Sequence, residues 1–273
     1  MGDRSGDAVR LPMGVYDIIV FNRSFNDFSN IAFRGNSYET LEAYARKVET
    51  RVDKKTRVET RTIISSPDEL AAATLEGFTV TEDMLGNYSQ TTYGRTAPSR
   101  SSEETPDGLY HLHFVPKKLT REVSAVLHIE GLNNIRSATC RLGGVAESIF
   151  LATGKTSANT VTQEFTPSNP EFSPGSPFNG TLSCEFEIFG LNVIDNNNLH
   201  LDALLVDGKT EFEGDCTNVK ITENDDGTGS VTLILEASTE KVPDVKPEGG
   251  AGSGFDVDVD GWGNEINTDI PIN

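Results

Sequence analysis

The 273-residue sequence has only three cysteines and no long run of apolar residues. Its three cysteines lack CxxC spacing, which argues against a zinc knuckle or a disulfide framework. In an oxidising compartment Cys184 and Cys216 could form one bridge; the alternative is three buried thiols, with Cys140 as the third. No stretch approaches the roughly 20 apolar residues of a membrane-spanning helix.

Positive charge is scarce in the second half of the chain. Residues 1–121 hold 16 Lys/Arg and 17 Asp/Glu, whereas residues 122–273 hold 7 and 25. Such an acidic half would repel phosphate backbones and anionic membrane surfaces, so nucleic acid is not an expected partner. The change in charge and the chain length together predict two domains, residues 1–108 and an acidic domain at residues 109–273.

Enzyme motifs are also missing. The sequence has no GxSxG, HExxH, GxxxxGK[ST] or strand-linked GxGxxG motif. The glycines between residues 249 and 254 are typical of a flexible linker and not of a phosphate-binding loop. We therefore expect no enzymatic activity, no catalytic residue and no cofactor.

One acidic run near the C-terminus resembles a calcium loop. Asp256, Asp258, Asp260 and Gly261 match the first half of an EF-hand loop, but position 12 is Asn267 instead of glutamate. Strands, not helices, are expected to flank the run. A solvated acidic strand face explains it better, and calcium binding by the three aspartates is the alternative.

Three histidines offer a second possible metal site. His111 and His113 would point to the same face of a predicted strand, and His128 would lie one strand later. The sequence places no carboxylate that would orient these imidazoles. A polar sheet face is the simpler interpretation, so we predict no metal site here.

Period-2 patterns and β-branched residues recur along the whole chain, which predicts antiparallel β-sandwiches with little helix. Turn residues at Asp207–Gly208 and at 224–229 predict two hairpins. The best helix candidate is 37–48, because Tyr38, Leu41 and Tyr44 would share a face. The predicted strands cover residues 16–21, 57–64, 109–115, 122–129, 182–189, 200–206, 217–222, 230–236 and 255–259.

The strand at 255–259 is amphipathic. Phe255, Val257 and Val259 alternate with the three aspartates, so apolar groups and carboxylates would lie on opposite faces. The Pro/Gly-rich stretch 242–253 before it would leave the strand free to pair at a sheet edge, in its own chain or in another.

Several short motifs occur in an order that resembles fimbrillin-like lipoproteins of the type V pilin superfamily, in particular minor-subunit and anchor-like members of unknown function. The resemblance covers nearly the whole chain. Its motifs are GVYDIIVFN at 14–22, LEAYA at 41–45, SPDEL at 66–70, EGFTV at 76–80, PKKLTR at 116–121, HIEGLNNI at 128–135, GVAES at 144–148 and GFDVDVDGW at 254–262.

The resemblance implies two transthyretin-like antiparallel β-sandwich domains in tandem, export, and a lipidated cysteine upstream of Met1. In the superfamily, cleavage after an arginine removes an N-terminal strand, and a strand from the next subunit fills the groove. Residues 15–21 are most like the removable strand, with Arg23 and Arg34 after them. The expected assembly residues are Tyr16, Ile18 and Val20 in that strand and Phe255, Val257 and Val259 at the C-terminus; the last strand could instead complete its own sandwich.

We therefore expect a non-enzymatic adhesion protein at the cell surface, either outer-membrane lipid-anchored or in a fimbrium after signal-peptide removal. Its partners would be other fimbrial subunits or surface ligands of host or bacterial cells. The alternative is a glycan-binding lipoprotein that uses Trp262 and loop tyrosines such as Tyr88 and Tyr93.

Overall fold

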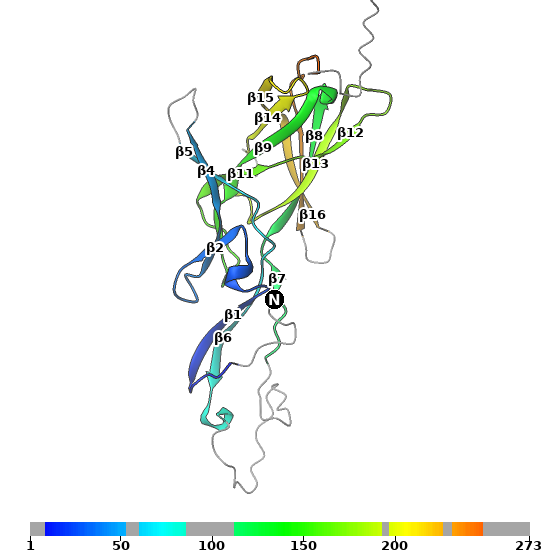
Figure 1. Ribbon diagram of the computed structural model, residues 1–273. Helices are drawn as coiled ribbons and strands as arrows, with labels where there is room; N and C mark the ends of the chain where they lie inside the picture. Colours follow the sequence, from blue (N-terminus) through cyan, green and yellow to red (C-terminus); the bar gives the residue numbers. More distant parts are fainter. Residues whose placement is uncertain (1–8, 53–59, 86–111, 193–196, 226–230, 248–273) are drawn as a thin grey trace, which may run out of the picture.

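The computed structural model describes residues 9–52, 60–85, 112–192, 197–225 and 231–247 (Figure 1). Within these ranges the chain is all-β, as predicted, and its only helical elements are the 3-10 turns η1 (Phe25–Asp27), η2 (Glu82–Met84) and η3 (Leu132–Asn134). None of these described helices is long and apolar enough to cross a membrane. The strands are β1 (Gly14–Phe21), β2 (Ile31–Arg34), β3 (Glu42–Ala45), β4 (Lys47–Val52), β5 (Thr60–Ile64), β6 (Ala71–Val80), β7 (Lys117–Lys118), β8 (Arg121–Glu130), β9 (Ile135–Ala146), β10 (Ser148–Phe150), β11 (Thr160–Phe165), β12 (Asn169–Phe172), β13 (Asn179–Ile188), β14 (Leu199–Leu205), β15 (Glu211–Asp215), β16 (Thr217–Asp225) and β17 (Val231–Ser238).

Two large sheets, built mostly from the C-terminal half of the chain, form a sandwich. One has the strand order β15-β14-β9-β11-β5-β4 and the other β12-β13-β8-β17-β16. Alternate residues of β8 and β14 are buried, as expected for strands with one face on a core. Phe165 of one sheet stacks on Phe186 of the other with ring centroids 4.3 Å apart. Burying each large apolar side chain in this layer contributes about 1.5–3 kcal/mol.

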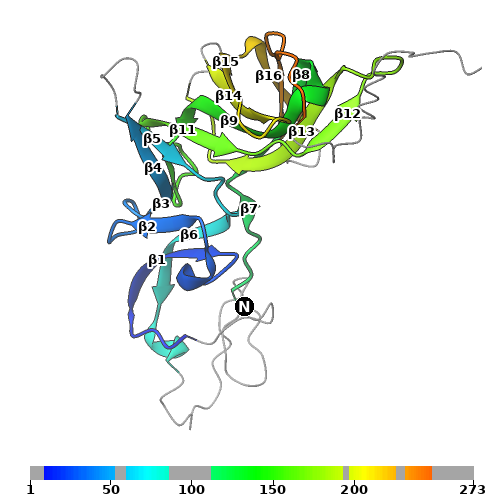
Figure 2. The same ribbon diagram turned by 45° about the horizontal axis from the view of Figure 1, so that its top comes forward.

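Two smaller sheets lie toward the N-terminal end of the molecule (Figures 1 and 2). The first has the order β1-β6-β7 and the second β10-β3-β2. Both contain strands from each side of residue 108, because β7 pairs with β6 and β10 pairs with β3. The strand β5 also joins the larger sandwich by pairing with β11.

The predicted domain boundary near residue 108 falls in 86–111, outside the described residues, and stays a prediction. Strand pairings link the two parts across this boundary. So does a single hydrophobic core, whose members range in sequence from Phe28 to Val242. Most strand pairs are antiparallel, as expected. The pairs β5–β11 and β8–β17 are parallel, and each joins strands far apart in sequence.

The helix predicted at 37–48 is wrong: β3 and the start of β4 occupy this segment. Residues 42–45 pair with β2, and residues 42–44 also pair with β10. Glu42, Ala43 and Ala45 are buried, so both faces of the strand are covered. The helical pattern was short, and pairing with two neighbouring strands outweighed it.

Most of the predicted strands are present in the structure. Segments 16–21, 122–129, 182–189, 200–206, 217–222 and 230–236 coincide closely with β1, β8, β13, β14, β16 and β17, and β5 occupies the end of 57–64. The strand predicted at 109–115 is wrong in its described part, because residues 112–115 have no regular structure. Segment 255–259 lies outside the described residues.

Candidate functional site

The strand β1 lies at the edge of its sheet. Among the described strands it pairs only with β6, in antiparallel register from Gly14 opposite Val80 to Phe21 opposite Ala72. Its other side therefore presents backbone groups that no described strand pairs. In Figure 1 the β1–β6 pair lies at the end of the molecule away from the large sandwich.

The predicted assembly residues Tyr16, Ile18 and Val20 lie on β1 and are half-buried. The core contacts of the strand come from the alternate residues Ile19 and Phe21, which pack against the buried cluster. The strand thus has one anchored face and one half-covered face. The assembly role of Tyr16, Ile18 and Val20 stays a prediction.

Four phenylalanines meet where β1 ends. The ring centroid of Phe21 lies 4.9 Å from that of Phe25, 5.5 Å from Phe33 and 6.3 Å from Phe28. Phe28 is buried, whereas Phe25 is half exposed. Such aromatic pairs stabilise by about 0.5–1.5 kcal/mol beyond the area they bury. Of these four rings, Phe21 is the one that belongs to β1. Removing β1 would therefore uncover Phe28 and Phe33.

A β-bulge fixes the register of this strand pair. Asp17 faces two residues of β6, Glu76 and Gly77, and its carboxylate accepts a hydrogen bond of 2.8 Å from the Gly77 amide. Gly77 has φ +67°, a backbone conformation that glycine adopts with little strain. At the start of the strand, the Tyr16 hydroxyl donates to the Pro12 carbonyl at 2.8 Å.

The two arginines after β1 differ in accessibility. Arg23 lies in an exposed bend between β1 and η1, with its guanidinium 6.0 Å from the centre of the Phe28 ring. Arg34 ends β2 and is held by Glu42 and Glu147. Gly35 after it has φ +99°, and the Thr40 backbone fills the space where a Cβ atom would lie. The peptide bond after Arg23 is therefore more accessible to a protease than the peptide bond after Arg34.

Several predicted residues cannot be placed. The assembly residues Phe255, Val257 and Val259, the aspartates of the calcium alternative, the aromatic residues of the glycan alternative and His111 all lie outside the described residues. His113 and His128 are exposed. Within the described part of the chain, no finding assigns these two histidines to a metal site.

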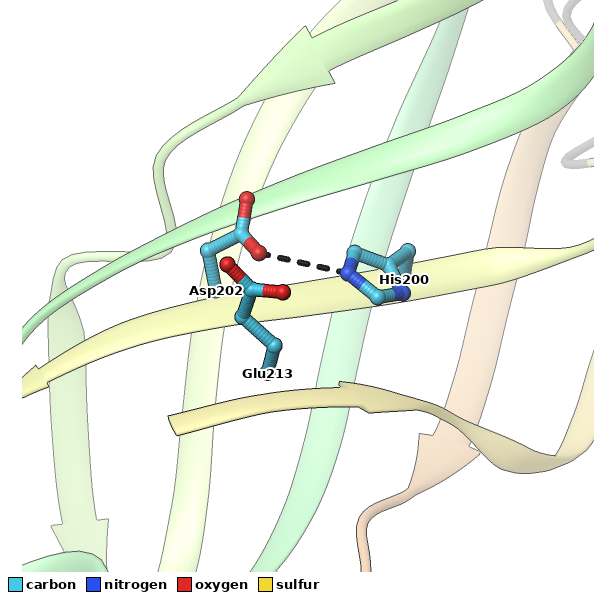
Figure 3. Close-up of side chains that lie close together, drawn as sticks. All are labelled: His200, Asp202 and Glu213. Carbon is cyan, nitrogen blue, oxygen red and sulfur yellow. Dashed lines mark ion pairs between the residues drawn. The ribbon is translucent and has the colours of Figure 1, made fainter. Parts of the chain in front are cut away.

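A group of ionisable residues that sequence reasoning missed lies on the β14–β15 hairpin (Figure 3). His200, Asp202 and Glu213 each offer a ligand atom, and these atoms lie within 4.8 Å of one another. The Nε2 atom of His200 is 3.2 Å from Oδ1 of Asp202, and its Nδ1 atom is 2.9 Å from Oδ1 of Asp215. The predicted turn at Asp207–Gly208 already implied this register, because it places residue 200 opposite 215 and residue 202 opposite 213.

A cleft of about 800 Å³ lies where β7, β10 and the ends of β13 and β17 meet. Lys118, Arg121 and Lys155 contribute positive charge to its wall. Lys118 pairs with Glu187 at 2.6 Å and Arg121 with Glu223 at 2.9 Å. These ion pairs neutralise two of the three cations, so the cleft gives little support for an anion-binding site.

The described residues thus form an all-β protein with an exposed edge strand, β1. Residues 1–166 match the family described as Domain of unknown function (DUF5119). The match covers more than half of the sequence, and the chain belongs to this family. A search of curated proteins finds no match.

Three solved structures are similar to the chain. A "putative adhesin" from Bacteroides ovatus ATCC 8483 is 17% identical, with a TM-score of 0.49 over 75% of this chain and 65% of that one. A "putative adhesin" from Bacteroides thetaiotaomicron VPI-5482 is 14% identical, with a TM-score of 0.36 over 75% and 60% of the two chains. A third, from Bacteroides ovatus, is 9% identical, with a TM-score of 0.33 over 74% and 56%.

The chain therefore spans less than two thirds of the length of each of these structures.

Proposed function

We propose that this chain is a non-enzymatic adhesion protein of the cell surface, a minor or anchoring subunit of a fimbria-like assembly that joins its neighbours by β-strand complementation. The observation that carries the proposal is the position of β1. It is an edge strand, it covers a cluster of phenylalanines, and an exposed arginine follows it. The sequence resemblance to fimbrillin-like lipoproteins points the same way.

Removal of β1 would create an acceptor groove. The edge of β6 would lose its partner along the whole of β1, and Phe28 and Phe33 would lose their contacts with Phe21. An incoming strand would restore the backbone hydrogen bonds and cover the exposed rings with its own apolar residues. The alternating run Phe255, Val257 and Val259 supplies a suitable row of side chains, and Ile266, Ile270 and Ile272 form a second one.

The same proposal places the protein at the outer membrane, held by a lipid anchor or within a fimbrium after signal-peptide removal. Its partners are other fimbrial subunits, or surface ligands on host or bacterial cells. The acidic second half of the chain fits contact with proteins better than contact with anionic membranes or nucleic acid.

Limited digestion with an arginine-specific protease tests the proposal. Intact mass identifies the bonds cleaved, and size-exclusion chromatography with light scattering follows assembly of the products. We expect cleavage after Arg23, release of β1 and growth of linear oligomers. If the chain is cut only within residues 94–108, or stays monomeric after losing β1, strand complementation is wrong and the chain is an unprocessed anchor or a stand-alone adhesin.

Matched variants test the cleavage site and the donor strand separately. Arg23→Lys keeps the positive charge near Phe28 but removes the protease site, and should abolish assembly. Arg136→Lys, at an exposed arginine of β9, serves as the control and should digest at the other sites and assemble like the original chain. Val257→Lys tests the donor strand, because it should permit cleavage while blocking oligomer growth. Assembly that is unchanged in Val257→Lys would exclude 255–259 as the donor.

A further inference from the structure

The β14–β15 hairpin places four ionisable side chains in a two-by-two array. His200 and Asp202 are two residues apart on β14 and share a face of the sheet. On β15, Asp215 lies directly opposite His200, and Glu213 directly opposite Asp202. Cβ atoms of such opposed pairs are about 4.5–5.5 Å apart, so the four side chains lie within reach of one another.

The two nitrogens of His200 face different carboxylates. Asp215 contacts Nδ1 at 2.9 Å, and Asp202 lies 3.2 Å from Nε2. A neutral imidazole carries one N–H, so it can donate to only one of these carboxylates. If Nδ1 donates to Asp215, the lone pair of Nε2 is directed at the Asp202 carboxylate. A positively charged species between them, either a proton or a metal ion, would relieve this unfavourable contact.

The local charge favours a divalent ion. The surrounding carboxylates belong to Glu164, Asp202, Glu213 and Asp215, while Arg141 supplies one guanidinium, which pairs with Glu164 at 3.1 Å and with Asp202. Carboxylates directly opposite each other on paired strands, such as Asp202 and Glu213, repel one another. A bound proton adds a single positive charge, whereas a divalent cation adds two.

We infer that His200, Asp202 and Glu213 form a binding site for a first-row divalent transition-metal ion such as Zn²⁺. One imidazole and two carboxylates form a ligand set for such ions, whereas Ca²⁺ and Mg²⁺ prefer oxygen ligands alone. In a tetrahedral zinc site with bonds of about 2.0–2.1 Å, neighbouring ligand atoms lie about 3.3 Å apart. The separation of 3.2 Å between His200 Nε2 and Asp202 Oδ1 fits a shared ion.

The surrounding residues complete the arrangement. Asp215 holds His200 by its other nitrogen, which fixes the ring orientation and leaves Nε2 free to coordinate. Arg141 contacts Oδ2 of Asp202, so that Oδ1 faces the imidazole. The strand β15 is an edge strand paired only with β14 among the described strands. A metal held by both strands would fasten this edge and leave a fourth coordination position for water or a group from a partner.

Calorimetric titration of the full chain, freed of metal with a chelator, tests the site with Zn²⁺ as the probe. We expect binding of one equivalent near neutral pH and a rise in the melting temperature of the protein. His200→Gln and Glu213→Gln should each weaken binding at least tenfold. Asp215→Asn should weaken it by about 10–100-fold, because it removes the carboxylate that orients the imidazole. An excess of Ca²⁺ should not compete.

His128→Gln is the matched control, since this exposed histidine lies on β8 in the other sheet. It should leave zinc affinity unchanged. Circular dichroism of each variant shows whether the fold is intact, and Glu213→Gln alone tests the site if His200→Gln is unstable. Absence of saturable binding, or binding that His200→Gln and Glu213→Gln both leave unchanged, would overturn the inference and favour a proton between the two side chains.

Discussion

Arg34 and Glu42 lie opposite each other on β2 and β3 and form a two-point ion pair, with Nε to Oε2 at 2.6 Å and Nη2 to Oε1 at 2.9 Å. The Glu42 residue is 7% exposed. Ser148 of β10 also donates to its carboxylate. Arg34 of β2 thus neutralises the Glu42 carboxylate, and Ser148 of β10 donates a hydrogen bond to it, so a glutamate can occupy this buried position between two neighbouring strands.

Glu42→Gln should destabilise the protein chiefly at neutral pH. The hydrogen bond from Arg34 holds the pKa of the Glu42 carboxyl below its usual value, opposed by its burial. A depressed pKa contributes stability above the unfolded-state pKa of about 4.3 and loses it as the pH falls through the folded-state pKa. We expect a loss of about 1–2 kcal/mol in the free energy of unfolding at pH near 7, which shrinks in acid.

Urea denaturation at a series of pH values measures this effect. The exposed Glu171 on β12 provides the control, since Glu171→Gln should change the free energy of unfolding by less than about 0.5 kcal/mol at every pH. An equal loss for Glu42→Gln across the whole pH range would show that the ionised form of Glu42 contributes nothing to stability.

The thiols should be unreactive in the folded protein. Cys140, Cys184 and Cys216 are all free; Cys140 is buried, as one alternative expected for all three, whereas Cys184 and Cys216 are half-buried. Burial raises the pKa of Cys184 and of Cys216 to about 11, and that of Cys140 well above its ordinary value. Near pH 8 only about one thousandth of the Cys184 and Cys216 groups would be thiolate, the reactive form. Titration with a thiol reagent should give three thiols after unfolding and very slow reaction before; one thiol after unfolding would indicate a bridge.

Phe21→Ala should loosen β1 from the rest of the molecule. The substitution removes the contacts with Phe25, Phe28 and Phe33, and for a half-buried ring we expect a loss of about 2 kcal/mol. Hydrogen exchange should quicken in β1 and β6 before it does in the large sandwich. The exposed Val15 on the same strand is the control, and Val15→Ala should have little effect. Uniform exchange across the protein would mean that β1 is not a separate unit of stability.

Gly77→Ala should cost about 1 kcal/mol through backbone strain alone. The residue has φ +67°, and a Cβ atom added there would meet nothing within 4 Å. Gly214 in β15 serves as the control because its φ is ordinary and an added Cβ would make only ordinary contacts with Phe212. Thermal unfolding of both variants checks the prediction. Equal melting temperatures for Gly77→Ala and the original chain would show that the bulge relaxes at no cost.

The sequence determined the local structure of most of the chain. Alternation of apolar and polar residues predicted β1, β8, β14 and β17, because side chains of a strand alternate between core and solvent. A turn at Asp207–Gly208 was predicted as well. A tight turn centred on this pair places Leu204 opposite Glu211 and Asp202 opposite Glu213, which is the register of β14 and β15. The array around His200 therefore follows from local sequence, although it was not recognised there.

Only the tertiary structure decided the contacts between distant segments. The burial of Glu42 depends on Ser148, which is 106 residues away, and on Arg34, so the local helical pattern around it was misleading. The parallel pairs β5–β11 and β8–β17 likewise join segments that no turn connects. Local periodicity predicts which face of a strand is buried. It does not predict the neighbouring strand, because the pairing of strands depends on how the whole core packs.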